Sequence, residues 1–292
     1  MRIPPRIQFH TVNRCFLKCK FCAIDKEQTI SLMSVEDFED YAKKCIAFGI
    51  REYELTPIVG DPMLDINLLS RIKFLSQYGI SKILFYTNLV LYGEIEKILD
   101  YEKIEVNISI YGGNRKEYHK NTGYDYYNVF KNNLNKLLTF ARKCDMIYKI
   151  KLWIRHEGTD YNPYMVANDI KKYNATGNND WKNPKAIVQT GRRGICQFAI
   201  EDNCIFPNGD ISICGWFDIN KQTIIGNLNK QSLEEIYDSK GKYEHILQEQ
   251  LEGRYTGICK NCTIWKNKSF KSWLFQEESY GNYVSDNWKM QS

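Results

Sequence analysis

Short apolar runs rich in β-branched and aromatic residues alternate with longer amphipathic stretches along residues 1–190 of this 292-residue chain. The short runs predict strands, and the stretches with apolar residues three and four positions apart predict helices. We expect strands at 7–11, 51–56, 81–87, 104–110, 148–154 and 185–189, and helices at 34–48, 66–78, 93–99, 127–143 and 163–173. Strands separated by helices form a parallel sheet with right-handed crossovers. Six such units are too few to close an eight-stranded barrel, so the sequence predicts an α/β fold, a partial (β/α)6 TIM-like barrel that is open on one side.

The pattern changes after residue 190. Two apolar runs, at 200–206 and 210–213, flank a Pro-Asn-Gly turn, which is typical of a hairpin. A helix is predicted to begin after Ser232, because Glu235 stands three residues further on, as in a capping box. We therefore predict a barrel domain over 1–190, a small second domain over 191–265 and a C-terminal tail over 266–292.

Three of the ten cysteines, Cys15, Cys19 and Cys22, follow the first predicted strand with the spacing C-x3-C-x2-C. Three thiolates on one tight loop can hold three corners of a [4Fe–4S] cluster. The fourth iron then has no protein ligand and can bind a substrate, by the logic that separates catalytic from structural zinc sites. A zinc site would need a fourth ligand, and His10 is a poor candidate because it lies within the predicted strand.

This motif resembles the signature of the radical S-adenosylmethionine (SAM) superfamily, C-x3-C-x-aromatic-C, with Phe21 at the aromatic position. The resemblance implies that the open iron binds SAM and that cleavage of SAM yields a 5′-deoxyadenosyl radical, which abstracts hydrogen from a substrate. The segment Val59-Gly60-Asp61-Pro62 resembles the Gly-Gly-Glu-Pro loop with which the family binds the SAM amino group, although it departs at Val59 and Asp61.

The resemblance also implies SAM contacts at the ends of later strands, from Thr87, Asn88 and Ser109. Many relatives bind the SAM carboxylate with a basic residue that has no clear equivalent here. Lys116, Lys120 and Arg155 are the candidates, and each is also explained as a solvated surface charge.

A second group of cysteines lies in the last third of the chain. Cys196, Cys214, Cys259 and Cys262 supply four thiolates, which suit either a structural zinc or a fully ligated [4Fe–4S] cluster. The pattern resembles the first half of the SPASM extension of radical SAM enzymes, and the absence of further cysteines resembles its shorter "twitch" version, with the layout of the 2-deoxy-scyllo-inosamine dehydrogenase family. That resemblance implies an auxiliary [4Fe–4S] cluster. Cys204 lies in a predicted strand and is expected to be a small buried residue.

A fully ligated auxiliary cluster has no open iron, so we expect it to accept an electron from the substrate radical. The net reaction is then a two-electron oxidation, such as alcohol to ketone, of a small polyol or sugar. Arg155 and His156, which follow the fifth strand, are candidates for the base. Modification of a ribosomally made peptide, by a crosslink or an epimerisation, is an alternative. An iron–sulfur electron carrier or scaffold is another, although the loop at Gly60 and Asp61 argues against it.

The charge pattern and hydropathy limit the partners. The net charge of +5 is spread along the chain without a block of like charge, which argues against binding nucleic acid. No apolar run approaches the ~18 residues of a membrane span, and the first residues lack the apolar core of a signal peptide. We expect a cytoplasmic protein with no membrane partner, where thiols stay reduced. The expected partners are a small-molecule or peptide substrate and a reducing protein such as flavodoxin or ferredoxin.

Overall fold

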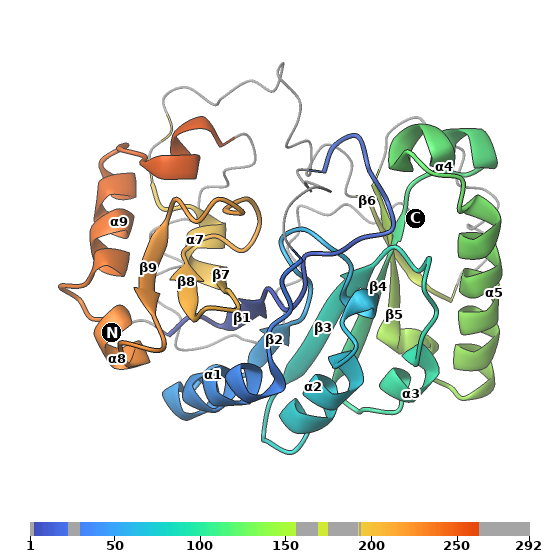
Figure 1. Ribbon diagram of the computed structural model, residues 1–292, viewed down its shortest axis with the longest axis horizontal. Coiled ribbons are helices and arrows are strands. Elements are labelled where there is room, and N and C mark those ends of the chain that lie inside the picture. Colours follow the sequence, from blue (N-terminus) through green and yellow to red (C-terminus); the bar gives the residue numbers. More distant parts are fainter. Residues whose placement is uncertain (1–2, 23–29, 156–168, 175–191, 193, 263–292) are drawn as a thin grey trace.

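The computed structural model describes residues 3–22, 30–155, 169–174, 192 and 194–262. Within these ranges nine strands form one sheet in the order β6-β5-β4-β3-β2-β1-β7-β8-β9 (Figure 1). The first six strands are parallel to one another, which confirms the predicted α/β fold with the parallel sheet of a partial barrel. They are β1 (Arg6–Phe9), β2 (Glu52–Glu54), β3 (Lys82–Thr87), β4 (Ile104–Ile110), β5 (Ile150–Ile154) and β6 (Lys171–Asn174).

The sixth strand differs from the prediction. Residues 171–174 form β6, although a helix was expected over 163–173. The reason is tertiary, because β6 pairs with β5 and the ring of Tyr173 stacks on Trp153 with centroids 4.6 Å apart. The rest of that predicted helix, residues 163–168, and the strand predicted at 185–189 lie outside the described residues.

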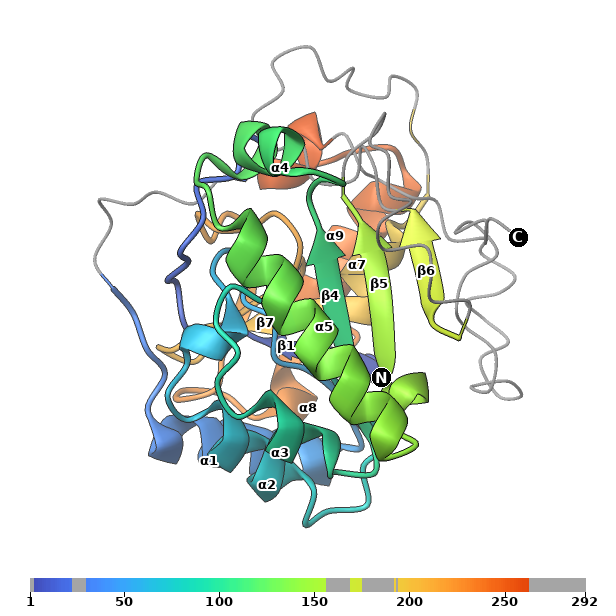
Figure 2. The same cartoon turned by 90° about the vertical axis from the view of Figure 1, so that its right-hand side faces the viewer.

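Four helices cover the outer face of the parallel strands (Figures 1 and 2): α1 (Val35–Phe48), α2 (Leu68–Leu75), α3 (Ile95–Leu99) and α5 (Tyr127–Lys143). Helix α1 begins where the sequence indicates, since the side chain of Ser34 accepts a hydrogen bond from the Asp37 amide, and it ends at Gly49 in the left-handed conformation. Its buried residues recur at helical spacing, so one apolar stripe packs on the sheet. A further helix, α4 (Arg115–Thr122), was not expected from the sequence.

The C-terminal part continues the same sheet. Strand β7 (Asp202–Ile205) pairs with β1 in parallel, and β8 (Asp210–Ser212) and β9 (Ile224–Asn227) extend the sheet in antiparallel fashion. The predicted hairpin is thus confirmed, but its first strand starts at residue 202, because residues 197–201 form the short helix α7 (Gln197–Glu201). The domain boundary predicted near residue 190 and the predicted tail lie outside the described residues.

The remaining described elements are α8 (Leu233–Ile236), α9 (Lys242–Leu251) and three short 3-10 helices: η1 (Pro62–Leu64), η2 (Ile147–Lys149) and η3 (Gly257–Asn261). Helix α8 carries the predicted capping box between Ser232 and Glu235. Among the described residues, every helix is too short or too polar to span a bilayer.

Candidate active site

The cysteine loop, residues 15–22, follows β1 and is held by the end of helix α4. The amides of Lys18 and Lys20 donate to the carbonyl oxygens of Thr122 (2.8 Å) and Asn121 (3.1 Å). The last carbonyl oxygens of a helix have no hydrogen-bond donor within the helix, and here the amides of the cysteine loop supply the missing donors. Helix α4, which sequence reasoning missed, therefore fixes the path of this loop.

The loop after β2 supports the cysteine loop from the other side. The amide of Asp61 donates to the carbonyl oxygen of Arg14 at 2.7 Å. Gly60 has φ +130°, and a Cβ atom there would lie 2.8 Å from the Val12 oxygen and 3.1 Å from the Arg14 oxygen. Only glycine allows this close approach of two backbones without strain. The glycine singled out in the sequence is thus required by the packing of the two loops.

The carboxylate of Asp61 is fully engaged by protein donors. It accepts hydrogen bonds from the Thr87 hydroxyl (2.9 and 3.0 Å), the Asn88 amide (2.7 Å) and the Met63 amide (3.0 Å). Burial raises the pKa of Asp61, and these hydrogen bonds oppose the rise. The side chain of Asp61 therefore fixes the end of β3 and the start of η1 relative to each other.

The chain turns sharply after β3. Leu89 is buried with φ +55°, a conformation that costs a non-glycine residue about 1–2 kcal/mol. The side-chain amide of Asn133 on α5 donates to the carbonyls of Leu89 (3.0 Å) and Val90 (3.1 Å), which holds the turn. The turn directs the side chain of Asn88 toward the cysteine loop, where its amide nitrogen lies 3.4 Å from the sulfur of Cys15.

These segments line a cavity, open to solvent, at the carboxyl ends of the strands, where ligands of parallel α/β sheets bind. The structure brings together in its lining nearly all the residues that the sequence indicated: Cys15, Cys19, Cys22, Phe21, Gly60, Asp61, Thr87, Asn88, Ser109 and Arg155. Pro62 is not part of this lining and is buried at the start of η1.

Aromatic and cationic groups form one wall of this cavity. The ring of Phe21 stacks on Tyr111 with centroids 5.8 Å apart, and burial raises the pKa of Tyr111 well above its usual value, so the phenol stays neutral. The Nε of Arg155 donates to the hydroxyl of Ser109 at 3.2 Å, and its guanidinium lies 5.2 Å from the ring centroid of Tyr86. Because a guanidinium stays protonated in proteins, Arg155 can bind an anion but cannot act as the base considered above.

The other basic candidates fall elsewhere. Lys116 and Lys120 are exposed on α4 and are not part of the cavity lining. His156 lies outside the described residues. Of the three residues considered for the SAM carboxylate, Arg155 is the one that faces the cavity.

The second group of cysteines surrounds a separate apolar cavity, lined by Cys196, Phe198, Ala199, Ile213, Cys214, Phe217, Ile258, Cys259 and Cys262. Burial and the nearby cysteines raise the pKa of Cys214 well above its usual value and that of Cys259 to about 12. Thiolates in such a place require a bound cation, so these groups suit metal ligands. In the described parts of the chain, no three His, Cys, Asp or Glu side chains converge on a single metal ion. Four thiols on one apolar cavity provide the ligands for either a structural zinc or a fully ligated cluster.

Cys204, by contrast, is fully buried in β7 and packs with Ile58 and Phe206, as predicted for a small core residue.

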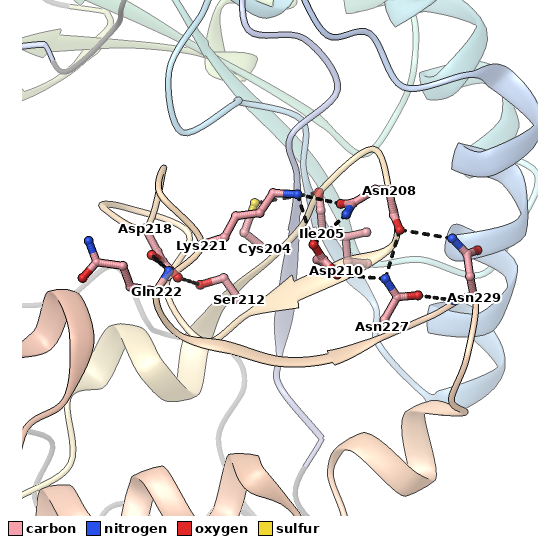
Figure 3. Close-up of polar contacts among 10 residues, drawn as sticks. All are labelled: Cys204, Ile205, Asn208, Asp210, Ser212, Asp218, Lys221, Gln222, Asn227 and Asn229. Atoms are coloured by element: carbon pink, nitrogen blue, oxygen red, sulfur yellow. Dashed lines mark hydrogen bonds and ion pairs between the residues drawn. The ribbon is translucent and has the colours of Figure 1, made fainter. Parts of the chain in front are cut away.

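Two polar networks position the second group. In the first, seen in Figure 3, the buried carboxylate of Asp218 accepts from the Ser212 hydroxyl (2.7 Å) and the Gln222 amide (2.6 Å). The Ser212 oxygen in turn accepts from the Cys214 amide at 3.1 Å. In the second, the buried side chain of Gln250 on α9 accepts from the Cys196 amide at 2.8 Å. Neither network was found from the sequence.

A signal for Gln250 was nevertheless present. The buried positions of α9 are Tyr243, Ile246, Leu247 and Gln250, which recur at helical spacing. A glutamine in an otherwise apolar stripe needs a buried hydrogen-bonding partner, and two of the cysteines provide one.

Comparisons with known families agree with this geometry. The model of the radical SAM superfamily matches residues 9–151, which include the cysteine loop and the loop after β2. The chain belongs to the radical SAM superfamily. The model of an iron–sulfur cluster-binding domain, SPASM, matches residues 196–263 of this radical SAM enzyme, a span that contains all four cysteines of the second group.

Solved structures share the fold at low sequence identity. BtrN in complex with AdoMet and 2-DOIA has a TM-score of 0.61 and 14% identity, covering 87% of this chain and 89% of BtrN. SuiB of Streptococcus suis bound to S-adenosylmethionine has a TM-score of 0.57 and 15% identity, covering 89% of this chain and 72% of SuiB. The enzyme anSMEcpe with bound AdoMet has a TM-score of 0.54 and 13% identity, covering 85% of this chain and 81% of the other. A search of curated proteins gave no match.

The cofactors of this radical SAM enzyme follow from its family. They are the radical SAM [4Fe–4S] cluster, SAM itself and an auxiliary iron–sulfur cluster in the SPASM region. The thiol-lined, apolar second cavity and the three-cysteine loop both have the donor sets that such clusters require.

Proposed function

We propose that this enzyme reductively cleaves SAM at a cluster held by Cys15, Cys19 and Cys22 and oxidises a small polyol or sugar by two electrons. One observation carries the proposal: a loop with only three cysteines opens into a cavity at the carboxyl ends of the strands, whereas four cysteines surround a separate apolar one. When bound, the first cluster would supply the electron that breaks SAM into methionine and a radical that takes one hydrogen atom from the substrate, and the auxiliary cluster would take up the second electron, with the hydroxyl proton passing to a base.

The protein contributes binding, orientation and exclusion of competing donors. The guanidinium of Arg155 offers a fixed positive charge for the SAM carboxylate, because Ser109 and the ring of Tyr86 hold it in place. Asp61 keeps Thr87 and Asn88 at the cavity wall. The neutral phenol of Tyr111 and the ring of Phe21 keep one side of the cavity aromatic.

Two arguments support the oxidation of a small molecule. A cluster ligated by Cys196, Cys214, Cys259 and Cys262 has no iron left to bind substrate, so an electron-accepting role fits it. In addition, BtrN, which has this fold, is described with 2-DOIA bound. The electron donor that we propose for the first cluster is a flavodoxin or ferredoxin.

A peptide substrate is the second candidate. SuiB, which has the same fold, is described bound to its precursor peptide SuiA, with a TM-score of 0.56, and anSMEcpe is described with the Kp18Cys peptide. The electron-carrier alternative is disfavoured, because the chain belongs to a family of SAM-cleaving enzymes.

The test is anaerobic reconstitution with iron and sulfide, followed by dithionite and SAM, with 5′-deoxyadenosine quantified by chromatography. We expect its formation by the wild-type enzyme and none by Cys19→Ala. A fully iron-loaded enzyme that makes no 5′-deoxyadenosine contradicts the proposal. Deuterium transfer into 5′-deoxyadenosine from deuterated polyols, compared with deuterated peptides, distinguishes the two substrate classes.

A further inference from the structure

Each of the two cysteine sites contains a buried carboxamide directed at a cysteine sulfur. At the first site, the Nδ2 of Asn88 lies 3.4 Å from the Sγ of Cys15. At the second, the Nε2 of Gln250 lies 3.9 Å from the Sγ of Cys259. Asn88 is 5% exposed and Gln250 is 1% exposed, so neither amide is solvated by bulk water.

The direction of each amide is set by its oxygen. The Oδ1 of Asn88 accepts from the Val90 amide at 2.9 Å, and the Oε1 of Gln250 accepts from the Cys196 amide at 2.8 Å. A carboxamide whose oxygen accepts a backbone N–H must turn its NH2 group to the other side. In both residues that side faces a sulfur atom.

Both side chains are also held by their own backbones. The backbone N–H of Asn88 donates to the Asp61 carboxylate, and the strained turn at Leu89 follows Asn88 directly. The Gln250 carbonyl accepts from the Gly194 amide at 3.1 Å. The surrounding structure must compensate for the strain at Leu89, and the turn there fixes the Asn88 side-chain amide against the cysteine loop.

We propose that Asn88 and Gln250 are positioning residues that donate an N–H to a cluster-bearing cysteine sulfur, and that each thereby raises the reduction potential of its own cluster. An added electron increases the negative charge on the sulfurs, so a fixed N–H donor stabilises the reduced cluster more than the oxidised one. The inference rests on the two clusters of the proposed function and assigns one tuning residue to each.

The test is a potentiometric titration of the reconstituted enzyme, followed by EPR, in Asn88→Leu and Gln250→Met. Each change removes the donor and keeps similar volume. We expect Asn88→Leu to lower the ratio of reduced to oxidised SAM cluster about tenfold at fixed potential, a shift of ~59 mV for one electron, and to leave the potential of the auxiliary cluster unchanged. Gln250→Met should do the reverse, so each variant is the control for the other. Gln248→Met, at an exposed position of the same helix, should shift neither cluster.

Unchanged potentials in two variants that contain both clusters overturn the inference, as does an equal shift of both clusters in either variant. If a variant loses iron, the inference is tested instead by a second measurement that needs only the wild-type enzyme. Pulsed EPR of the reduced clusters should detect ¹⁵N coupling after labelling of Asn for the SAM cluster and of Gln for the auxiliary cluster, and its absence overturns the inference equally. Failure of the proposed function is distinguishable, because it is seen as missing clusters or missing 5′-deoxyadenosine in the unmutated enzyme.

Discussion

Replacing Asp61 by Asn tests whether its carboxylate holds the SAM cavity together. The two carboxylate oxygens accept from two buried amides, of Met63 and Asn88, and from the Thr87 hydroxyl. In Asp61→Asn one oxygen becomes an NH2 group, which cannot accept. Whichever way the new amide turns, one buried backbone N–H faces another donor. An unpaired buried N–H costs about 1–3 kcal/mol, so we expect the free energy of unfolding to fall by about 2 kcal/mol.

The same change should weaken SAM binding. The carboxylate joins the loop after β2 to Thr87 and Asn88, which both line the cavity, so we expect its loss to raise the Kd of SAM about tenfold, equivalent to ~1.4 kcal/mol. The Kd is measured anaerobically from the change in the EPR spectrum of the reduced cluster as SAM is added, and stability from urea denaturation.

Asp65→Asn is the matched control. Asp65 is also buried in this segment, but it pairs with Arg71 at 2.8 Å, and neither residue lines the SAM cavity. Breaking a buried ion pair costs about 3–5 kcal/mol, so this variant should be less stable than Asp61→Asn and yet bind SAM with an unchanged Kd. Equal SAM affinity in the wild type and Asp61→Asn, or an equal loss of affinity in both variants, refutes the reasoning.

Three further predictions use other residues. Gly60→Ala should lower the free energy of unfolding by about 3 kcal/mol and abolish SAM binding, since its Cβ meets two backbone oxygens. The Cβ of Gly79→Ala meets no atom within 4 Å, so this variant should bind SAM normally; urea denaturation measures stability and EPR measures SAM binding in both. Burial lowers the pKa of His10 from 6.5 to about 4, so as the pH falls the unfolded chain binds a proton before the folded chain does. The free energy of unfolding should therefore fall by about 3 kcal/mol from pH 6.5 to 4, and urea denaturation over this range should show no such fall from this group in His10→Asn. Cys214→Ala should reduce the iron content from about eight to about four atoms per chain, while Cys204→Ala should leave it unchanged, and a colorimetric iron assay decides.

The first five parallel strands and the residues that line the SAM cavity were largely predictable, because the local hydrophobic pattern indicates the strands and the cysteine spacing and loop motif indicate the lining. Helix α4 was not, since few of its side chains are apolar and only Tyr118 among them is a buried aromatic. It is held by the packing of Tyr118 in the core and by two hydrogen bonds from the cysteine loop, which are tertiary contacts. Strand β6 likewise forms because β5 offers an edge and Trp153 a stacking partner, and neither is visible in residues 171–174.

The chemistry of individual side chains was less predictable than their location. The motif placed Asp61 near SAM, but its bonds to Thr87 and Asn88 join residues 26 and 27 positions apart and depend on how two loops meet. Arg155 was considered as a base, yet its fixed protonation leaves it only a role in binding anions.

The parallel pairing of β1 with β7 has a consequence for how the chain reaches its folded state. It joins Arg6 to Asp202, 196 positions later in the sequence. During synthesis, β1 emerges first, and the edge that will pair with β7 stays unpaired while almost the whole barrel is made. Such an edge invites pairing with other chains, and a contact between such distant residues forms slowly. A fragment that stops after the barrel should therefore aggregate, whereas in the full chain the halves that carry the two clusters should melt together in one cooperative transition.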